Sequence, residues 1–483
     1  MIPPSIRPRK TPPGLRISLD SSLDDLCRPT RGSSTICAKL VTVRQGRKEA
    51  VVLSLTKPAI IGRDPDRCSY IVTDTSVSSV HCKLYAVRSP NGGVIVSCQD
   101  LSRNGIHLNG QHIRKTCIIL MDGDVLELPN SLAFTCVHIW KESRNKITIF
   151  DPTPPVQPSH KHIGGYIVTS QCLGTGSFAT VHLALDPVKH RQVACKSIRT
   201  KKEYEVGQVM KEVRILMTIR HPNINEIYDT EEDKNFIHIF LQLCTGGDLF
   251  TYITDHPSTG NRLCEAEAKY VMFQLLKGLN YLHDNMISHR DLKPENILLY
   301  SPGPYPRILI ADFGLARPNA YQETFNVCGT VSYLPPEGVL ALDHKHLGYV
   351  GMPADCWSAG VILFIMLSGS HPFDYGCSSD SSSDWFTHIQ ESRALSEGSQ
   401  LSQSYVHNES KLKARIIDGR AEFRPYLWKD LKDARLLVES LLVHNHLLRA
   451  TARSALQNKW IDCELDELES LYDRRILAAV ETA

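Results

Sequence analysis

The sequence has little net charge of either sign. Its 483 residues include 54 Lys and Arg against 52 Asp and Glu, which gives a formal net charge of +2 at pH 7. A protein that binds nucleic acid through bulk electrostatics needs a basic excess that this chain lacks. The shares of hydrophobic residues (42%) and charged residues (22%) are ordinary for globular domains. We therefore expect folded domains and no direct contact with nucleic acid.

Paired cysteine motifs and long apolar segments are also missing. Fifteen cysteines lie between Cys27 and Cys463 without one C-x-x-C pair, and an odd number cannot all pair within one chain. We interpret them as reduced thiols in the cytosol or nucleus. The longest apolar run, 359–367, is about half of the ~20 residues that a membrane helix needs. The start, MIPPSIRPRK, has no apolar signal core. These features predict a soluble intracellular protein without a membrane contact.

The first third of the chain divides into three parts by composition. Residues 1–35 are rich in Pro, Ser, Arg and Asp and predict a disordered arm. Short alternating runs separated by turn residues predict an all-β sandwich over residues 36–140. The Pro-rich stretch that follows predicts a semi-rigid linker over residues 141–165. The sandwich is therefore expected to be a separate domain.

The rest of the chain predicts one larger domain over residues 166–463. Strand patterns come first, and helical spacings of three and four then dominate. The Ser-rich stretch 377–410 predicts an insertion that loops into solvent. Residues 464–483 form a C-terminal tail, acidic and then basic, with the pattern of a short amphipathic helix. The fold class is thus multi-domain, with an all-β domain followed by an α+β domain.

Five ordered motifs lie in the larger domain. A glycine-rich turn, from Gly174 to Val181, falls between two expected strands, where small residues let backbone N–H groups approach phosphates. Lys196 follows on the next expected strand, and Glu212 on the helix after it. Taken alone, these two residues could equally well be an incidental pair on the surface. The segments His-Arg-Asp-Leu-Lys-Pro-Glu-Asn, Asp-Phe-Gly and Pro-Pro-Glu then follow in order. Together these motifs make coincidence a negligible explanation.

Residues 166–463 resemble the catalytic domain of eukaryotic serine/threonine protein kinases, a two-lobed α+β fold. The resemblance implies ATP and Mg²⁺ as cofactors. It implies that Asp291 accepts the proton of the substrate hydroxyl, that Lys293 steadies the transferred phosphoryl group, and that Asn296 and Asp312 hold Mg²⁺. The residues that it implies for ATP are Leu173, Gly174, Gly176, Val181, Lys196, Glu212 and Asp248.

The same resemblance implies several supporting roles. Glu337 is expected to pair with Arg449, and Asp355 is expected to brace the catalytic loop from a buried helix. His289 is expected to be a packed loop residue, because the neighbouring aspartate already suits the proton-accepting role. Lysine at position 293 indicates specificity for serine and threonine rather than tyrosine.

Acidic residues suggest which substrates are preferred. Asp248 and Glu295 resemble positions that hold an arginine upstream of the phosphoacceptor. The alternative is that Asp248 only binds the ATP ribose and that Glu295 is solvated.

Activation is predicted from a cation beside the catalytic loop. In kinases of this kind, a residue such as Arg290 is usually neutralised by a phosphate on the segment that follows Asp312. In DNA-damage checkpoint kinases a threonine commonly lies two residues before the Cys-Gly-Thr sequence at 328–330, where this chain has Asn326. The remaining candidates are Thr324, Thr330 and, less favoured, Ser332, and we expect Thr324 to be the phosphorylation site. Thr330 is expected to stay unmodified and to bond to the catalytic loop. The alternative is that Asn326 orders the segment without any phosphate.

The β domain resembles a forkhead-associated (FHA) domain, which binds phosphothreonine. The matching segments are Gly-Arg at 62–63, Ser-Ser-Val-His at 78–81 and Asp-Leu-Ser-Arg-Asn-Gly at 100–105. Each segment alone would favour an ordinary sandwich with common turn residues. A planar guanidinium with hydroxyl and amide donors suits a phosphate dianion. The residues implied for phosphothreonine are Arg63, Ser78 and Asn104, with Ser79 and Arg103 as neighbours.

An FHA domain joined to a kinase of the calcium/calmodulin-dependent group resembles the DNA-damage checkpoint effector kinases and their meiotic relatives. We therefore expect a nuclear serine/threonine kinase that is recruited and activated through phosphothreonine. Its expected partners are phosphothreonine proteins, substrates with an upstream arginine and, transiently, a second copy of the chain. A meiotic chromosome kinase of the same architecture is the alternative. A pseudokinase scaffold is disfavoured, because the motif set is complete.

Overall fold

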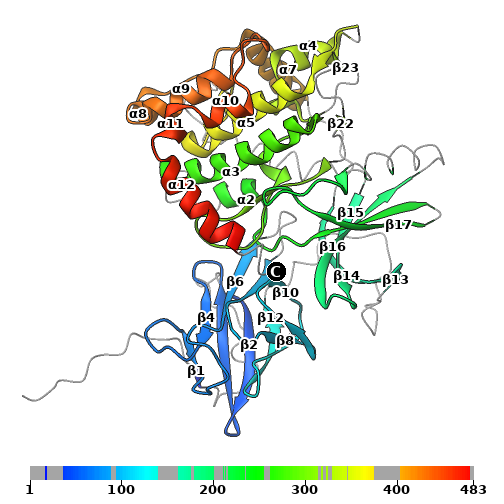
Figure 1. Cartoon of the computed structure of the whole chain (residues 1–483), viewed down its shortest axis with the longest axis vertical. Coiled ribbons are helices and arrows are strands. Elements are labelled where there is room, and N and C mark those ends of the chain that lie inside the picture. Colours follow the sequence, from blue (N-terminus) through cyan, green and yellow to red (C-terminus); the bar gives the residue numbers. More distant parts are fainter. Residues whose placement is uncertain are drawn as a thin grey trace, which may run out of the picture. The chain divides into compact units, whose positions relative to one another are not determined.

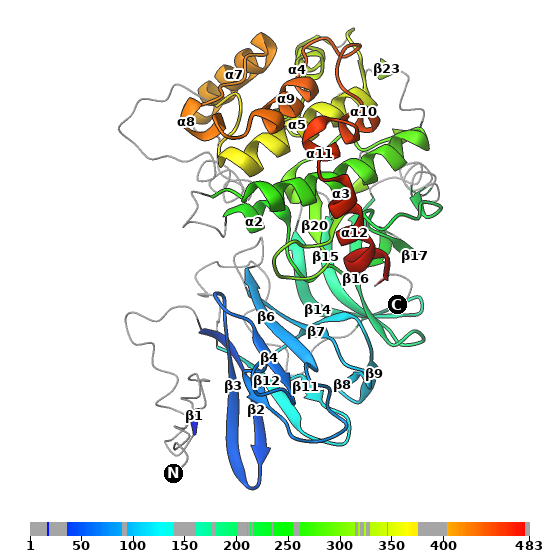
Figure 2. The same cartoon turned by 60° about the vertical axis from the view of Figure 1, so that its left-hand side comes forward.

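Figures 1 and 2 show the computed structural model of the chain, in which an N-terminal β domain precedes a larger domain of strands and helices. We describe the two domains separately. The described residues are 17–18, 36–88, 94–139, 161–175, 179–200, 210, 213, 216–233, 235–254, 261–313, 317–318, 323–324, 329–344, 346–374 and 403–478.

The β domain is a sandwich of two sheets, as the alternating sequence pattern predicts (Figure 2). Apolar side chains from both sheets share one core, in which Leu40, Leu84 and Phe134 are fully buried. The first sheet has the order β1 (Ile17–Ser18), β3 (Arg47–Ser54), β2 (Ile36–Arg44), β12 (Ala133–His138), β11 (Val125–Glu127), β8 (Ile106–Leu108) and β9 (Gln111–Ile113). The second has the order β10 (Cys117–Leu120), β7 (Val94–Asp100), β6 (Cys82–Arg88), β4 (Ala59–Gly62) and β5 (Tyr70–Ile71).

Part of the N-terminal arm differs from its prediction. Ile17 and Ser18, which fall in the arm expected to be disordered, form β1 and pair with Ala50 and Glu49 of β3. The outer side of β3 would otherwise be a sheet edge, whose backbone N–H and C=O groups can take up another strand. The rest of the arm lies outside the described residues.

The larger domain begins with a six-stranded sheet. Its order is β13 (Lys161–Ile163), β14 (Tyr166–Thr175), β15 (Ala179–Asp186), β16 (Arg191–Arg199), β18 (Phe236–Gln242) and β17 (Ile227–Asp233). The predicted linker therefore ends earlier than 165, because β13 pairs with β14. Met210 and Val213, from the helix expected to carry Glu212, pack against β17 and β18.

Helices form most of the second lobe, around one large apolar core (Figure 1). They are α2 (Leu249–Thr254), α3 (Glu265–Asp284), α4 (Pro336–Asp343), α5 (Gly351–Ser368), α7 (Gln403–Asp418), α8 (Pro425–Trp428), α9 (Lys432–Leu441), α10 (Ala452–Leu456), α11 (Lys459–Asp462) and α12 (Leu465–Tyr472), followed by the π-helical turn η6 (Asp473–Leu477).

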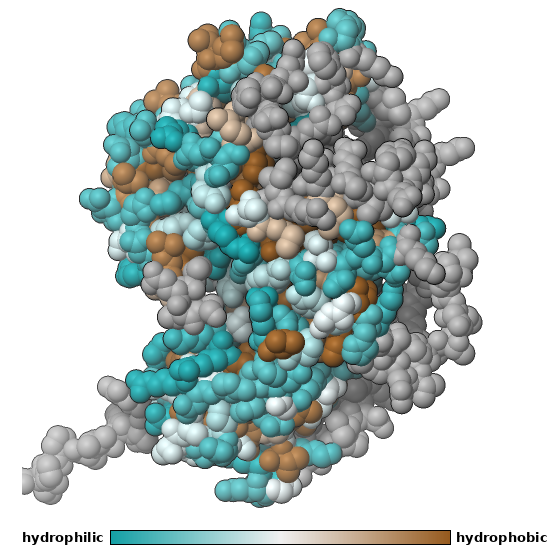
Figure 3. All heavy atoms as spheres, turned by 45° about the vertical axis from the view of Figure 1, so that its right-hand side comes forward, coloured by the Kyte–Doolittle hydropathy of each residue, from teal (hydrophilic) through white to brown (hydrophobic). Residues whose placement is uncertain are grey.

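Helix α5 contains the longest apolar run of the sequence. Among the described residues it is the one helix long and apolar enough to cross a membrane, and 89% of that window is buried inside the domain. On the face shown in Figure 3, the coloured hydrophobic residues form small separate patches among hydrophilic ones. The apolar run is therefore accounted for by a central core helix, as predicted.

Two boundaries near the C-terminus differ from their predictions. Residues 403–410 of the predicted insertion belong to α7, whereas 377–402 lie outside the described residues. The segment predicted as a tail is part of the domain, because Leu468, Tyr472 and Ile476 are buried in its core. Their spacing of four places all three on one helix face.

Short paired strands hold the segments that carry the motifs. The pairs are β19 (Ile287–Ser288) with β22 (Arg317–Pro318), β20 (Ile297–Leu299) with β21 (Ile308–Ile310), and β23 (Glu323–Thr324) with β24 (Tyr349–Val350). Two 3₁₀ turns, η3 (Pro294–Asn296) and η5 (Val331–Tyr333), complete this region.

Candidate functional site

The buried carboxylate of Asp355 binds the backbone of the loop that carries the predicted catalytic residues. Asp355 in α5 is 1% exposed, and its two oxygens accept the backbone N–H groups of Arg290 and His289, each at 2.8 Å. His283 Nε2 donates to the same carboxylate at 3.1 Å. Burial alone would lower the pKa of His283, but the hydrogen bonds and charges of Asp355 and Cys356 together outweigh it and raise that pKa to about 9. Asp355 thus braces the loop, as predicted.

His289 is a packed residue. Its Nε2 donates to the carbonyl of Ala311 at 2.8 Å, and its Nδ1 accepts the backbone N–H of Asp291 at 3.3 Å. The ring is fully buried, and both nitrogens serve the loop. This agrees with the prediction that Asp291, rather than His289, is the base.

Four side chains converge at the catalytic loop. Asp291 Oδ1 accepts hydrogen bonds from the backbone N–H and the hydroxyl of Thr330, at 2.9 and 3.0 Å. Its Oδ2 accepts one from Asn296 Nδ2 at 3.1 Å and lies 3.0 Å from Lys293 Nζ. Lys293 Nζ also donates to Thr330 Oγ1 at 2.8 Å. The predicted base, the predicted cation and the unmodified threonine therefore meet in one cluster.

The cluster continues into a second pair of charges. Lys196 Nζ, on β16, lies 2.5 Å from Asp312 Oδ1. Partial burial works to raise the pKa of Asp312, but the charge and hydrogen bond of Lys196, with the nearby His289 and Lys293, together outweigh it and hold that pKa below its usual range. The Asp312 side chain is still 50% exposed, so its ionised carboxylate can reach a cation. Asn296 donates its amide N–H groups to Asp291, so its amide oxygen is the atom with which it could ligate a metal. Oxygen donors of this kind suit Mg²⁺.

The predicted nucleotide-binding residues are only partly described. Leu173 and Gly174 lie on β14, and Val181 lies on β15. A Cβ built on Gly174 would meet no described atom within 4 Å, so the backbone there is open to a ligand. Gly176 and Glu212 lie outside the described residues.

Asp248 is a structural cap. Its side chain is 3% exposed, and Oδ1 accepts the backbone N–H of Thr251 at 2.7 Å, in the first turn of α2. The predicted contact of Asp248 with ATP or with a substrate arginine stays a prediction.

In the β domain, one short segment anchors the three residues predicted to bind phosphothreonine. Arg63 Nε donates to the carbonyl of Val77 at 2.5 Å, and Asn104 Nδ2 donates to the carbonyl of Ser76 at 2.8 Å. Ser78 Oγ accepts the backbone N–H of Arg103 at 3.1 Å. The side chains come from three loops, and all of them except the half-buried Ser78 are exposed.

A buried histidine holds two of these loops together. His81 Nδ1 accepts the backbone N–H of Ser78 at 3.0 Å, and its Nε2 donates to the carbonyl of Gly105 at 3.0 Å. Burial lowers the pKa of His81, so the ring stays neutral and can fill both roles. Gly105 has φ +77°, and a Cβ there would lie 2.6 Å from the carbonyl oxygen of Ile113. Position 105 therefore requires glycine.

Comparisons with known proteins agree with this geometry. The family model "Protein kinase domain" matches residues 167–461. The chain belongs to the protein kinase family. The model "FHA domain" matches residues 59–129, so the kinase carries an FHA domain ahead of its catalytic domain.

Several known proteins are similar to this chain. Meiosis-specific serine/threonine-protein kinase MEK1 of Saccharomyces cerevisiae is 31% identical over 86% of this chain and 83% of its own length. The mek1 kinase of Schizosaccharomyces pombe is 29% identical over 86% of this chain and 84% of its own length. Calcium/calmodulin-dependent protein kinase type 1 of Macrobrachium nipponense is 32% identical over 63% of this chain and 77% of its own length. A crystal structure of Rad53 1-466 in complex with AMP-PNP is 23% identical, with a TM-score of 0.46, and covers 88% of this chain and 100% of that chain.

The protein is therefore a serine/threonine protein kinase that binds ATP and protein substrates. Its FHA domain is of the type that binds phosphothreonine peptides. This confirms the predicted family, fold class and enzyme class.

The kinase domain contains the predicted pair of Glu337 and Arg449. The two form a bidentate ion pair at 2.8 and 3.0 Å, and the side chain of Arg449 is fully buried. The other N–H groups of Arg449 reach the backbone carbonyls of Pro353, Val443 and His444. This ion pair joins α4 to the loop before α10.

Sequence reasoning missed His371. Its Nε2 donates to the carbonyl of Ser332 in η5 at 2.8 Å, next to Thr330. Burial lowers the pKa of His371 to about 4, which keeps the ring neutral. The residue stands outside every motif, so no pattern in the sequence could have identified it.

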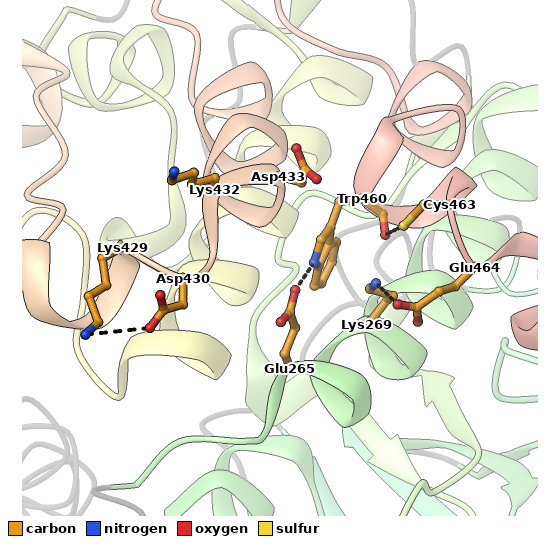
Figure 4. Close-up of a pocket in the computed structure, with 9 residues that line it drawn as sticks. All are labelled: Glu265, Lys269, Lys429, Asp430, Lys432, Asp433, Trp460, Cys463 and Glu464. Carbon is orange, nitrogen blue, oxygen red and sulfur yellow. Dashed lines mark hydrogen bonds and ion pairs between the residues drawn. The ribbon is translucent and has the colours of Figure 1, made fainter.

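The pocket drawn in Figure 4 lies on the helical lobe, away from the catalytic cluster. Its volume is about 470 Å³. Glu265 accepts the indole N–H of Trp460 at 2.7 Å, and Lys269, only 4% exposed, pairs with Glu464 at 2.8 Å. These groups satisfy one another, so we assign the pocket a structural role.

Proposed function

We propose that this kinase acts in the nucleus, where its FHA domain recruits it to the phosphothreonine proteins of DNA-damage checkpoint signalling. The observation that supports this is the presence of two assembled sites on one chain. One is the Asp291, Lys293 and Thr330 cluster, and the other is the set of Arg63, Ser78 and Asn104 anchored on a single segment. Binding through the second site would raise the local concentration of substrate at the first.

The alternative is a meiotic chromosome kinase of the same architecture. The names of the yeast relatives that span both domains favour the meiotic role. One experiment distinguishes the checkpoint role from the meiotic role. The phosphothreonine proteins that co-purify with the FHA domain are identified from meiotic cells and, separately, from damaged mitotic cells. Partners found only in damaged mitotic cells would favour the checkpoint.

For the reaction, we infer that Asp312 and Asn296 hold Mg²⁺ and that Lys196 contacts the α- and β-phosphates. Mg²⁺ neutralises charge on the β- and γ-phosphates. Asp291 accepts the proton of the substrate hydroxyl, whose oxygen forms the new bond to the γ-phosphorus while the bond to the β–γ bridging oxygen breaks. Lys293, 2.8 Å from Thr330 Oγ1, stands beside the base and steadies the transferred phosphoryl group.

For substrate choice, we propose that Glu295 in η3 favours an arginine upstream of the phosphoacceptor. Glu295 lies between Lys293 and Asn296 in the catalytic loop, so its carboxylate is close to where a peptide would bind. Its charge complements a guanidinium.

Replacing Arg63 by alanine is expected to weaken the binding of phosphothreonine peptides by roughly 10- to 100-fold, because hydrogen bonds to charged groups are the stronger ones. Calorimetry on the full chain measures this. Arg67, which is also exposed and lies four positions away, provides the matched control, and Arg67→Ala should bind normally. The kinase activity on a free peptide should be the same in both variants. Equal affinity of the unaltered protein for phosphorylated and plain peptide would refute the assignment.

Phosphorylation of Thr324 is the proposed activating step. Thr324 in β23 lies directly opposite Tyr349 in β24, and such pairs place their side chains on one face. Arg290 Nε donates to the hydroxyl of Tyr349 at 3.2 Å. Tyr349 thus brings Thr324 and the buried Arg290 to one place, where a phosphate could neutralise the cation. Asn326 lies outside the described residues.

Thr324→Ala is expected to abolish recovery of activity after phosphatase treatment. The treated, unaltered kinase should be weakly active and should recover with ATP after a lag that shortens as protein concentration rises, since transient self-association would let copies phosphorylate one another. Thr324→Ser should recover like the unaltered protein. Full activity in phosphate-free protein would instead support ordering by Asn326.

A further inference from the structure

The C-terminal helix α12 lies beside α3 (Figures 1 and 2). Charged and aromatic side chains connect the two helices. Lys277 Nζ lies 2.8 Å from both carboxylate oxygens of Glu469. The same ammonium stands 4.4 Å from the ring centre of Tyr472 and 4.9 Å from that of Phe273. Tyr472 and Phe273 meet edge to face. Contacts with Lys277 and Phe273 therefore hold the ring of Tyr472 in place.

The hydroxyl of Tyr472 ends on a fully buried asparagine. It donates to Asn223 Oδ1 at 2.7 Å. Asn223 Nδ2 in turn donates to Gln274 Oε1 and to the carbonyl of Ile308, both at 3.0 Å. Burial raises the pKa of Tyr472, so the hydroxyl keeps the proton that it donates. The amide of Asn223 has one orientation that satisfies all of these partners.

Asn223 also holds strand β21 by its backbone. The N–H of Ile310 donates to the carbonyl of Asn223 at 2.8 Å, and the N–H of Asn225 donates to the carbonyl of Ile310 at 2.9 Å. The N–H of Ile308 donates to Gln274 Oε1 at 3.0 Å, so the strand and Asn223 share that partner. Asp312 follows only two residues after β21.

We propose that Tyr472 is a positioning residue for phosphoryl transfer, which acts through Asn223 on strand β21 and so on the carboxylate of Asp312. Asp312 has φ +62°, a backbone conformation that residues other than glycine rarely keep without support. The support comes from the residues just before it. Ala311 donates its N–H to the carbonyl of Asn296, and β21 is held by Asn223. Loss of the Tyr472 hydroxyl would leave Asn223 Oδ1 buried without this donor. The side-chain amide of Asn223 would then no longer be held in one orientation.

Tyr472→Phe tests this, because it removes only the hydroxyl. We expect kcat on a free peptide to fall about tenfold with little change in the KM of the peptide, since misplaced catalytic groups slow the chemical step more than they weaken remote binding. Asn223→Ala should lower kcat at least as much. The double variant should be no worse than Asn223→Ala alone, because both changes break one chain of contacts.

Tyr252→Phe is the matched control. Tyr252 is a partly buried tyrosine of the helical lobe, and its hydroxyl donates to Glu267 at 2.6 Å. This hydrogen bond involves neither Asn223 nor β21. Its loss should lower the melting temperature and leave kcat close to normal.

Two readouts do not depend on activity. Thermal stabilisation by a non-hydrolysable ATP analogue should require a higher Mg²⁺ concentration in Tyr472→Phe, because Asp312 is less well placed, whereas stabilisation without Mg²⁺ should be unchanged. Hydrogen exchange at the Ile310 amide should be faster in Tyr472→Phe than in the control. An equal loss of kcat in both tyrosine variants, or an unchanged Mg²⁺ requirement, would reduce Tyr472 to a purely structural residue and overturn the proposal.

Discussion

Asp291→Ala is expected to lower kcat on an Arg-x-x-Ser/Thr peptide by at least ~10²-fold, the usual size of a lost general base. The described partners of the Asp291 carboxylate are Thr330, Lys293 and Asn296. Steady-state kinetics and nucleotide titration measure the effect. The affinity for ATP should change little.

Asp291→Asn should be almost as inactive, because an amide cannot accept the proton of the substrate hydroxyl. Its N–H group would also face Thr330 and Lys293, which are themselves hydrogen-bond donors. Lys196→Met should instead weaken nucleotide binding, since Lys196 is the cation assigned to the phosphates. Asp284→Ala removes an exposed carboxylate of the same lobe and should be fully active. Near-normal kcat in Asp291→Ala would rule out the role assigned to it.

Arg449→Ala is expected to destabilise the kinase domain by about 3–5 kcal/mol, the usual cost of removing one partner from a buried ion pair. The substitution leaves the Glu337 carboxylate, only 19% exposed, without its guanidinium. The guanidinium also stands 5.0 Å from the ring centre of Trp357, so tryptophan fluorescence during urea unfolding reports the change.

Arg453→Ala is the control for this prediction. Arg453 also makes two hydrogen bonds to one carboxylate, that of Asp284, but the two side chains are 66% and 49% exposed. Exposed pairs contribute up to ~1 kcal/mol, because water competes with both partners. A similar loss in both variants would show that burial is not what makes the Arg449 pair important.

Much of the catalytic site could be predicted from the sequence, because its residues lie close together along the chain. Asp291, Lys293 and Asn296 fall within six positions, and one turn of backbone brings them into contact. The FHA residues were predictable for a different reason. Arg63, Ser78 and Asn104 each sit in a turn next to a strand, and the order of strands and turns marks those loops.

The predictions that needed correction concern the edges of the domains. Leu468, Tyr472 and Ile476 have the spacing of an amphipathic helix, but spacing does not tell whether a helix is covered by a partner. The same limit applies to β1, whose two residues gain their structure from the open edge of β3. In each case a second segment, remote in sequence, supplies the partner.

The sequence by itself determined the chemistry of this protein, since phosphoryl transfer and phosphothreonine binding each need certain residue types at short, ordered spacings. The tertiary structure alone decided some of the groups that support that chemistry. His371 and Asn223 act through hydrogen bonds to η5 and to β21, which lie far away from them in the chain. A buried polar group must find a partner wherever the fold provides one, and that partner is chosen by the packing of whole helices and strands rather than by neighbouring residues.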